Sequence, residues 1–292
     1  MTRITAFAKV NLSLQVRPID RLGLHELRSL AQSIDLFDEV EVSPAEEDVF
    51  RVDSVEEVPA DEGNLVWRAV EAVRGSARFP VEVTLAKRIP VAAGFGGGSA
   101  DAAAALLAAG GMLGLARESV VSLAPALGSD VPFCLIGGRL WIEGHGERLT
   151  EALMSTDFAL AVAVPPFEMS TAAVYRRWDE LGGPAGPEVA GRDLPPSLRE
   201  HGPLSNDLAP AAMDLRPDLA DWITDLATTW GRPVAMSGSG PSVFAFFADI
   251  EEAAHAADEV RGARASVAAA PVDRGWDGDP GGVLPGPPWG VG

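Results

Sequence analysis

The spacing of apolar residues predicts strands and helices in separate blocks along the chain. Residues 3–16 and 79–89 alternate between polar and apolar side chains, which is the period of a strand. Residues 65–73 carry their apolar side chains at helical spacing. A glycine turn then leads into alanines and leucines that predict a helix over 99–109, with Gly110-Gly111 expected to end it.

The pattern changes near residue 155, where helical spacing becomes dominant. The helices expected after this point cover 171–182, 206–229 and 250–262, and a strand–turn–strand covers 232–249. From Pro271 onward glycine and proline are so frequent that we expect a disordered tail.

These blocks differ from the regular βαβ alternation of a doubly wound sheet, so we predict an α+β fold. The expected organisation is a first domain over residues 1–154, a second over 155–270 and a tail over 271–292.

Composition narrows the class of protein. The 292 residues carry a net charge of −19, which argues against a nucleic-acid binder because such proteins present a basic face. No apolar run reaches the roughly 18 residues of a membrane span, and the start lacks a secretory signal. The lone cysteine, Cys134, excludes internal disulfides and fits a reducing compartment. We expect a cytoplasmic protein, monomer or homodimer, that binds neither nucleic acid nor membrane.

Lysine and asparagine are scarce in this chain, and their few positions are candidates for specific roles. Lys9 and Lys87 are the only lysines among 23 basic residues, and Asn11, Asn64 and Asn206 are the only asparagines. In a chain so rich in arginine, a retained lysine favours a place that needs a compact ammonium group.

The glycine turn has the features of an anion site. Four glycines, Gly94, Gly96, Gly97 and Gly98, precede the helix, so backbone N–H groups and the helix dipole point at one spot. The spacing matches neither the P-loop, which needs a following lysine, nor the dinucleotide fingerprint. A plain strand–helix turn is the alternative to phosphate binding. Ser99 is expected to cap the helix or to offer its hydroxyl to a phosphate-bound Mg²⁺.

The loop PVAAGFGGGSADAAAAL, residues 90–106, resembles the phosphate loop of the GHMP kinase superfamily. Seven further segments follow the superfamily order and are similar to its branch that acts on 4-diphosphocytidyl-2-C-methyl-D-erythritol. These are AKVNLSLQV (8–16), GLHELRSL (23–30), NLVWRA (64–69), LGSDVPFCLIGG (127–138), EGHGERL (143–149), SNDL (205–208) and MSGSGPSVFAFF (236–247). The resemblance implies an N-terminal ribosomal protein S5 domain 2-like domain, a C-terminal ferredoxin-like domain, and ATP-dependent phosphorylation of a hydroxyl group.

The resemblance also implies a role for particular residues. Asp130 would be the catalytic base, and Lys9 would keep it ionised and stabilise the transferred phosphoryl group. Without the motif, Asp130 would be read as a turn cap and Lys9 as a solvent-facing strand residue. Asn11 lies two residues after Lys9, so a strand places both side chains on one face.

The remaining expected site residues fall into three groups. The ATP group is Asn64, Lys87, Pro90, Val91, Ala92, Ala93, Gly94, Phe95, Gly96, Gly97, Gly98, Ser99 and Ala100. The acceptor group is Asn11, His25, Thr171, Tyr175, Gly238 and Gly240. The metal group is Ser99 alone, for Mg²⁺ bound with ATP. Lys87 could equally be a solvated charge at a strand end, and Asn206 is expected to organise a loop.

Two positions depart from the pattern of this branch. Leu24 and Ala31 stand where the branch usually has aromatic residues, one of which stacks on the cytosine. Tyr175, or a relocated aromatic such as Phe37 or Trp178, would have to supply the stacking. The departures leave open a GHMP kinase acting on another small alcohol or sugar, or a non-catalytic relative that only binds ligands.

Overall fold

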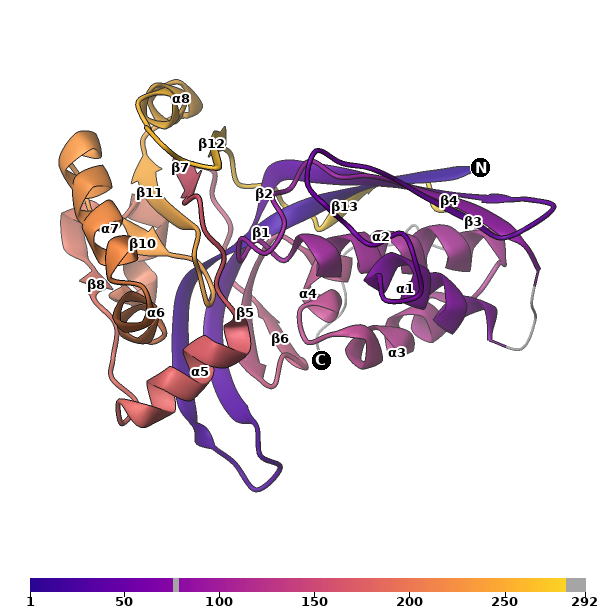
Figure 1. The fold of residues 1–292 in the computed structure, drawn as a ribbon, viewed down its shortest axis with the longest axis horizontal. Helices are drawn as coiled ribbons and strands as arrows, with labels where there is room; N and C mark the ends of the chain where they lie inside the picture. The colour runs from indigo at the N-terminus through magenta and orange to yellow at the C-terminus, as the bar shows by residue number, and fades with distance from the viewer. Residues whose placement is uncertain (76–78, 282–292) are drawn as a thin grey trace.

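The computed structural model describes residues 1–75 and 79–281, which form two large sheets with their helices and one two-stranded sheet. The long strands β1 (Thr2–Ile19) and β2 (His25–Pro44) pair along most of their length, and the hairpin between them projects past α5 (Figure 1). Strand β1 therefore extends beyond the predicted residues 3–16 at both ends.

The first sheet, sheet A, has the order β13-β1-β2-β4-β3, with β5 beside β2 and β6 beside β5. Only the β3–β4 pair is parallel among these strands. Its remaining strands are β3 (Val49–Asp53), β4 (Val81–Ala86), β5 (Arg139–Gly144), β6 (Arg148–Glu151) and β13 (Trp276–Gly278).

Four helices cover one face of sheet A (Figure 1). They are α1 (Leu65–Arg74), α2 (Gly97–Met112), α3 (Arg117–Leu127) and α4 (Val131–Ile136). Every residue of α2 from Ala100 to Gly110 is buried, as expected for a helix that is apolar on all sides.

The prediction that α2 spans 99–109 and ends at the glycine pair is wrong, because the helix begins at Gly97 and continues to Met112. The two glycines serve close packing instead. A side chain at Gly110 would lie 2.6 Å from the Val120 Cγ2 atom of α3, and one at Gly111 would overlap the Pro280 carbonyl.

The second half contains sheet B, an antiparallel sheet of order β10-β11-β7-β12, and a separate β8–β9 pair. The strands are β7 (Ala159–Val164), β8 (Glu188–Val189), β9 (Leu204–Ser205), β10 (Ala235–Met236), β11 (Val243–Phe247) and β12 (Ala265–Ala269). The helices are α5 (Thr171–Glu180), α6 (Ala209–Leu215), α7 (Pro217–Trp230) and α8 (Ile250–Asp258), with short 3₁₀ helices at Gly191–Asp193 and Pro196–His201.

The predicted helix over 206–229 is two helices, α6 and α7, that separate at Arg216. Pro217 lacks a backbone N–H and is tolerated only in the first turn of a helix, so it starts α7 rather than continuing α6. Within residues 1–75 and 79–281, none of the helices has both the length and the hydropathy needed to cross a membrane.

The prediction of a disordered tail from residue 271 is wrong for residues 271–281, and 282–292 lie outside the described residues. Strand β13 pairs with β1 at Ile4–Ala6, and the Trp276 indole donates to the Leu135 carbonyl at 3.0 Å. The glycines here permit close packing, because Gly275 lies against Gly137 and Cys134. The chain changes from sheet A to sheet B between β6 and β7, and the division at residues 154 and 155 stays a prediction.

A buried ion cluster joins three elements under the glycine turn. Lys87, just after β4, pairs with Asp38 of β2 and with Asp101 of α2, whose carboxylate lies 2.9 Å from its ammonium group. Burial alone would lower the pKa of Lys87, but the two carboxylates outweigh it and raise that pKa. Burial and the nearby Asp38 raise the pKa of Asp101, against the opposite effect of Lys87. The cluster therefore fixes the start of α2 against sheet A.

Lys87→Met should lower the free energy of unfolding by about 3–5 kcal/mol, because it leaves two buried carboxyl groups without their cation. Arg88→Met is the matched control, because the Arg88 side chain is exposed and pairs with the exposed Asp53. The free energy of unfolding of this variant should stay nearly unchanged. Urea unfolding at neutral pH measures both. Equal stability of the two variants would contradict the cluster's role.

Candidate active site

Two pockets meet beside strand β1. The first, the loop pocket, has a volume of about 570 Å³ and lies along residues 90–99 of the glycine turn. The second, the strand pocket, has a volume of about 250 Å³ and contains Lys9 and Asp130. Gly94, Gly96 and Thr171 line both pockets, so the two spaces adjoin each other.

Lys9 and Asp130 form an ion pair in the strand pocket. The Lys9 ammonium lies 3.2 Å from an Asp130 carboxylate oxygen. The Lys9 side chain is 6% exposed, whereas that of Asp130 is 35% exposed and accessible to a ligand. Asp130 precedes the first turn of α4 but makes no capping hydrogen bond there, so its carboxylate is available for chemistry.

Asn11 fixes the Lys9 side chain in place. Its side-chain oxygen accepts a 2.6 Å hydrogen bond from the Lys9 ammonium, and its amide donates to the Ser29 hydroxyl at 2.7 Å. Ser29 in turn donates to the Ser13 carbonyl. All of these side chains are buried, so the network holds the lysine in one orientation. As predicted, Lys9 and Asn11 lie on one face of β1.

The glycine turn packs directly against this network. Gly96 has φ +66°, and a side chain there would lie 3.0 Å from the Lys9 Cε atom. Gly94 has φ +84°, and a side chain there would lie 2.9 Å from the Ser237 carbonyl. The amides of Gly97 and the two residues after it occupy the first turn of α2, where no helical carbonyl can accept from them. They are donors for an anion in the loop pocket.

The structure brings together most of the residues predicted for ATP. All of them line the loop pocket except Ala100, which is buried inside α2. Lys87 is neither a solvated charge nor free for a ligand, because Asp38 and Asp101 occupy it. The Val91 amide donates to the Glu56 carboxylate, so it is occupied within the protein.

Two further polar residues predicted from the motifs have structural contacts. Asn64 caps α1 by accepting from the Val66 amide. Asn206 donates to the Met236 and Gly238 carbonyls, which agrees with its predicted loop-organising role.

Four of the six residues predicted for the acceptor line the strand pocket: Asn11, Thr171, Tyr175 and Gly238. His25 does not. Its two ring nitrogens lie 2.8 Å from the Arg17 carbonyl and 3.2 Å from the Asp179 carboxylate, and its ring lies 5.2 Å from that of Tyr175. Gly240 also lies outside the pocket, in a turn where its amide donates to the Ser237 carbonyl.

Tyr175 is the aromatic side chain of the strand pocket. Burial, with the Asp130 carboxylate nearby, raises the pKa of Tyr175 to about 12, so its hydroxyl stays protonated near neutral pH. Phe37 packs on Phe7, at the opposite end of the β1–β2 pair from His25. Trp178 is 3% exposed and packs behind His25. Neither of these two aromatics replaces the missing ring.

The two non-aromatic positions have different environments. Leu24 is 52% exposed at the end of the β1–β2 hairpin, whereas Ala31 is fully buried in β2. Only Leu24 is therefore accessible to a ligand. The apolar wall of the strand pocket comes instead from Leu14, Leu27 and Ile142.

Sequence reasoning missed several residues that support the site. Ser29 and Ser237 connect Asn11 to neighbouring strands, and Ser237 also donates to the Gly94 carbonyl at 3.3 Å. Asp38 and Asp101 neutralise Lys87. Ser29, Ser237 and Asp101 lie inside quoted motifs, so they could have been found there. The contact of Asp38 with Lys87 depends on strand pairing that no local pattern encodes.

Gly96→Ala should lower the free energy of unfolding by about 1–2 kcal/mol without nucleotide, because φ +66° is unfavourable for a residue with a side chain. Contact with Lys9 adds to this cost. Gly98→Ala is the control: its added methyl would lie 3.7 Å from Leu65, an ordinary contact. Chemical denaturation compares the variants, and equal stability would contradict this loop geometry.

Comparisons with known proteins identify the family. The GHMP kinases N terminal domain matches residues 64–138, and the GHMP kinases C terminal domain matches residues 194–265. A curated relative from Cutibacterium acnes, named 4-diphosphocytidyl-2-C-methyl-D-erythritol kinase, is 40% identical over 80% of this chain and 82% of its own. A relative of the same name from Corynebacterium efficiens is 39% identical over 88% of this chain and 89% of its own.

Solved structures show the same fold. A crystal structure of 4-(cytidine 5'-diphospho)-2C-methyl-D-erythritol kinase is 33% identical, with a TM-score of 0.77 over 92% of this chain and 98% of that one. A homoserine kinase from Cytophaga hutchinsonii, 18% identical, shares the fold with a TM-score of 0.67 over 95% of this chain and 97% of that one. The predicted α+β fold of two GHMP kinase domains is confirmed. The chain therefore belongs to the GHMP kinase family, among relatives named 4-diphosphocytidyl-2-C-methyl-D-erythritol kinase.

Proposed function

We propose that this protein transfers the γ-phosphoryl group of ATP to a hydroxyl of 4-diphosphocytidyl-2-C-methyl-D-erythritol. The Lys9–Asp130 pair carries the proposal, because it lies in the strand pocket where that pocket joins the loop pocket. The names of relatives that are about 40% identical over most of their length support the choice of acceptor over other small alcohols or sugars.

The loop pocket is proposed to hold the nucleotide. The free amides at the start of α2 would donate to its phosphates, and the glycines let the backbone approach closely. ATP supplies the phosphoryl group, and Mg²⁺ bound to its phosphates would neutralise their charge. The Ser99 hydroxyl lines the loop pocket and makes no hydrogen bond within the described part of the chain, so it is the proposed protein ligand for Mg²⁺.

The strand pocket is proposed to hold the reacting hydroxyl. Asp130 would orient this hydroxyl and accept its proton, for which its partly exposed carboxylate is suited. Lys9 would stabilise negative charge on the transferring group. Asn11 would act through Lys9 by holding its ammonium group.

The cytosine is proposed to lie against Tyr175, with Leu14 and Leu27 as apolar neighbours. His25 would position Tyr175 rather than contact the base, because both of its ring nitrogens face protein oxygens. Gly238 and Thr171 would border the acceptor where it approaches the glycine turn. The cytoplasmic location, and a monomeric or homodimeric state, stay predictions.

Asp130→Asn should lower kcat by about 10²–10⁴-fold, because the amide cannot accept the proton of the acceptor hydroxyl. ATP affinity, measured by calorimetry, should change less than about threefold. An assay coupled to ADP release, with and without the cytidine acceptor, measures turnover, and Asp225→Asn on the exposed face of α7 serves as control. Turnover by Asp130→Asn near the wild-type rate would contradict the assignment of the base, and ADP release that ignores the cytidine acceptor would contradict the substrate.

Tyr175→Leu should raise the KM for the cytidine acceptor roughly tenfold or more, because base stacking on an aromatic ring contributes about 1–3 kcal/mol. The KM for ATP should stay the same. Tyr175→Phe keeps the ring and is the matched control, with an acceptor KM near wild type. If the leucine variant binds the acceptor as well as the phenylalanine variant does, Tyr175 does not hold the base.

A further inference from the structure

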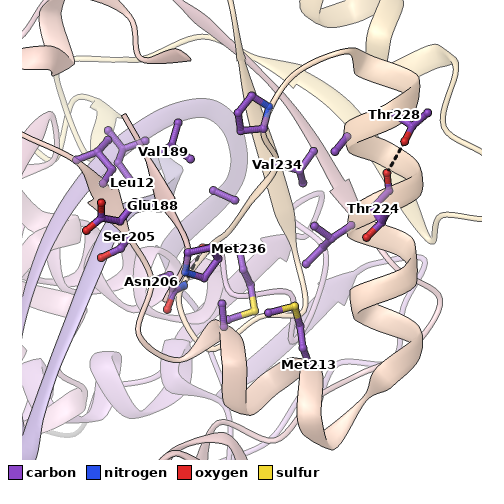
Figure 2. A pocket seen from close by; sticks show the side chains of 17 residues that line it. Leu12, Glu188, Val189, Ser205, Asn206, Met213, Thr224, Thr228, Val234 and Met236 are labelled. Atoms are coloured by element: carbon purple, nitrogen blue, oxygen red, sulfur yellow. Dashed lines mark hydrogen bonds between the residues drawn. The ribbon is translucent and has the colours of Figure 1, made fainter. Parts of the chain in front are cut away.

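A third pocket, the seam pocket, lies in the second half of the molecule. Its volume is about 440 Å³, and its walls come from β1, the β8–β9 pair, β10 and the helices α6 and α7 (Figure 2). Among the described residues, none that lines it also lines the loop pocket or the strand pocket. The seam pocket is therefore a separate space from the candidate active site.

The seam pocket lies between two apolar cores that do not contact each other at this point. Leu12, Val189 and Leu204 belong to the core between β1 and sheet B, whereas Ala209 and Met236 belong to the core between sheet B and its helices. Strand β10 is an edge strand of sheet B, and β9 pairs with β8 instead of extending that sheet.

The lining chemistry suits an apolar ligand. Met213, Ile223 and Val234 are partly exposed in the pocket, and Figure 2 shows Met213 and Met236 side by side at one end. Thioether side chains adapt their shape to varied apolar ligands. A concave pocket of several hundred Å³ with apolar walls and few polar groups is typical of small-molecule sites.

The polar groups of the seam pocket define one end of the ligand. Thr224 and Thr228 donate to carbonyls of their own helix, so their hydroxyl protons are already used. Glu188 is solvent-exposed, and its carboxylate has no ion-pair or hydrogen-bond partner in the described part of the chain. No lysine or arginine is present among the described lining residues. An anionic ligand would therefore meet an unopposed carboxylate, whereas an ammonium group would neutralise it.

We propose that the seam pocket binds a compact apolar molecule that ends in an amine, with the amine at Glu188. The floor of this pocket adjoins the active site through Asn206, whose amide donates to the carbonyls of Met236 and Gly238. Gly238 lines the strand pocket. The two spaces are thus adjacent but separated by main chain, and an occupant of the seam pocket leaves the nucleotide site open.

Three naphthalene compounds of similar apolar size test the proposal: 1-naphthylmethylamine, 1-naphthalenemethanol and 1-naphthoate. Calorimetry on the full chain should show saturable binding of the amine, about tenfold weaker binding of the alcohol, and still weaker binding of the acid. Glu188→Gln should bring the amine and the alcohol to similar affinity. Saturating ATP should leave the amine affinity unchanged.

Variants that fill the pocket test whether the amine binds there. Ala227→Phe places a ring in the pocket from α7 and should abolish amine binding while kcat stays near wild type. Ala235→Leu is a second filling variant from β10, and Thr229→Phe, at an exposed position of α7 outside the pocket, is the matched control that should bind normally. Equal binding of amine and acid, binding retained by both filling variants, displacement by ATP, or no saturable binding of any compound would overturn the proposal.

Discussion

The contact between the Lys9 side chain and the glycine turn is the constraint on which the rest of the site depends. Gly96 has room for Lys9 only because it carries no side chain, and its left-handed backbone then directs the chain into α2. The same contact sets the distance between the start of α2 and the lysine. The first-turn amides of α2 and the Lys9 ammonium group therefore form one rigid unit, which suits the proposed phosphoryl transfer, a reaction whose catalysis is mostly positioning and electrostatics.

Two buried networks hold this unit from opposite sides. On the β1 side, Asn11 and Ser29 orient Lys9 through hydrogen bonds. On the other side, Lys87 and its two carboxylates attach α2 to sheet A. The chain has a net charge of −19, and its two lysines have different partners. Lys87 pairs with two buried carboxylates inside the protein, whereas Lys9 pairs with the partly exposed Asp130 beside the N-terminus of α2, where the two pockets adjoin.

Local sequence predicted the parts of the site that a short motif encodes. The glycine turn and the side-by-side placement of Lys9 and Asn11 follow from residue type and strand periodicity. The roles proposed for Asp130 and Lys9 come instead from the resemblance to the GHMP kinase superfamily. The end of α2 was missed because Gly110 and Gly111 look like a helix terminus, although they make room for α3 and for the segment near Pro280. The ordered structure of residues 271–281 was not predicted, for a similar reason. Their glycines pack against backbone far away in sequence, which composition cannot reveal.

The central claim is that one hydroxyl acceptor and one nucleotide meet at the Lys9–Asp130 pair. A crystal structure with a non-hydrolysable ATP analogue and 4-diphosphocytidyl-2-C-methyl-D-erythritol tests it most directly. We predict the triphosphate on the first-turn amides of α2, and one acceptor hydroxyl within hydrogen-bond distance of the Asp130 carboxylate and in line with the γ-phosphorus. A triphosphate elsewhere, or an acceptor hydroxyl out of reach of Asp130, would contradict the account.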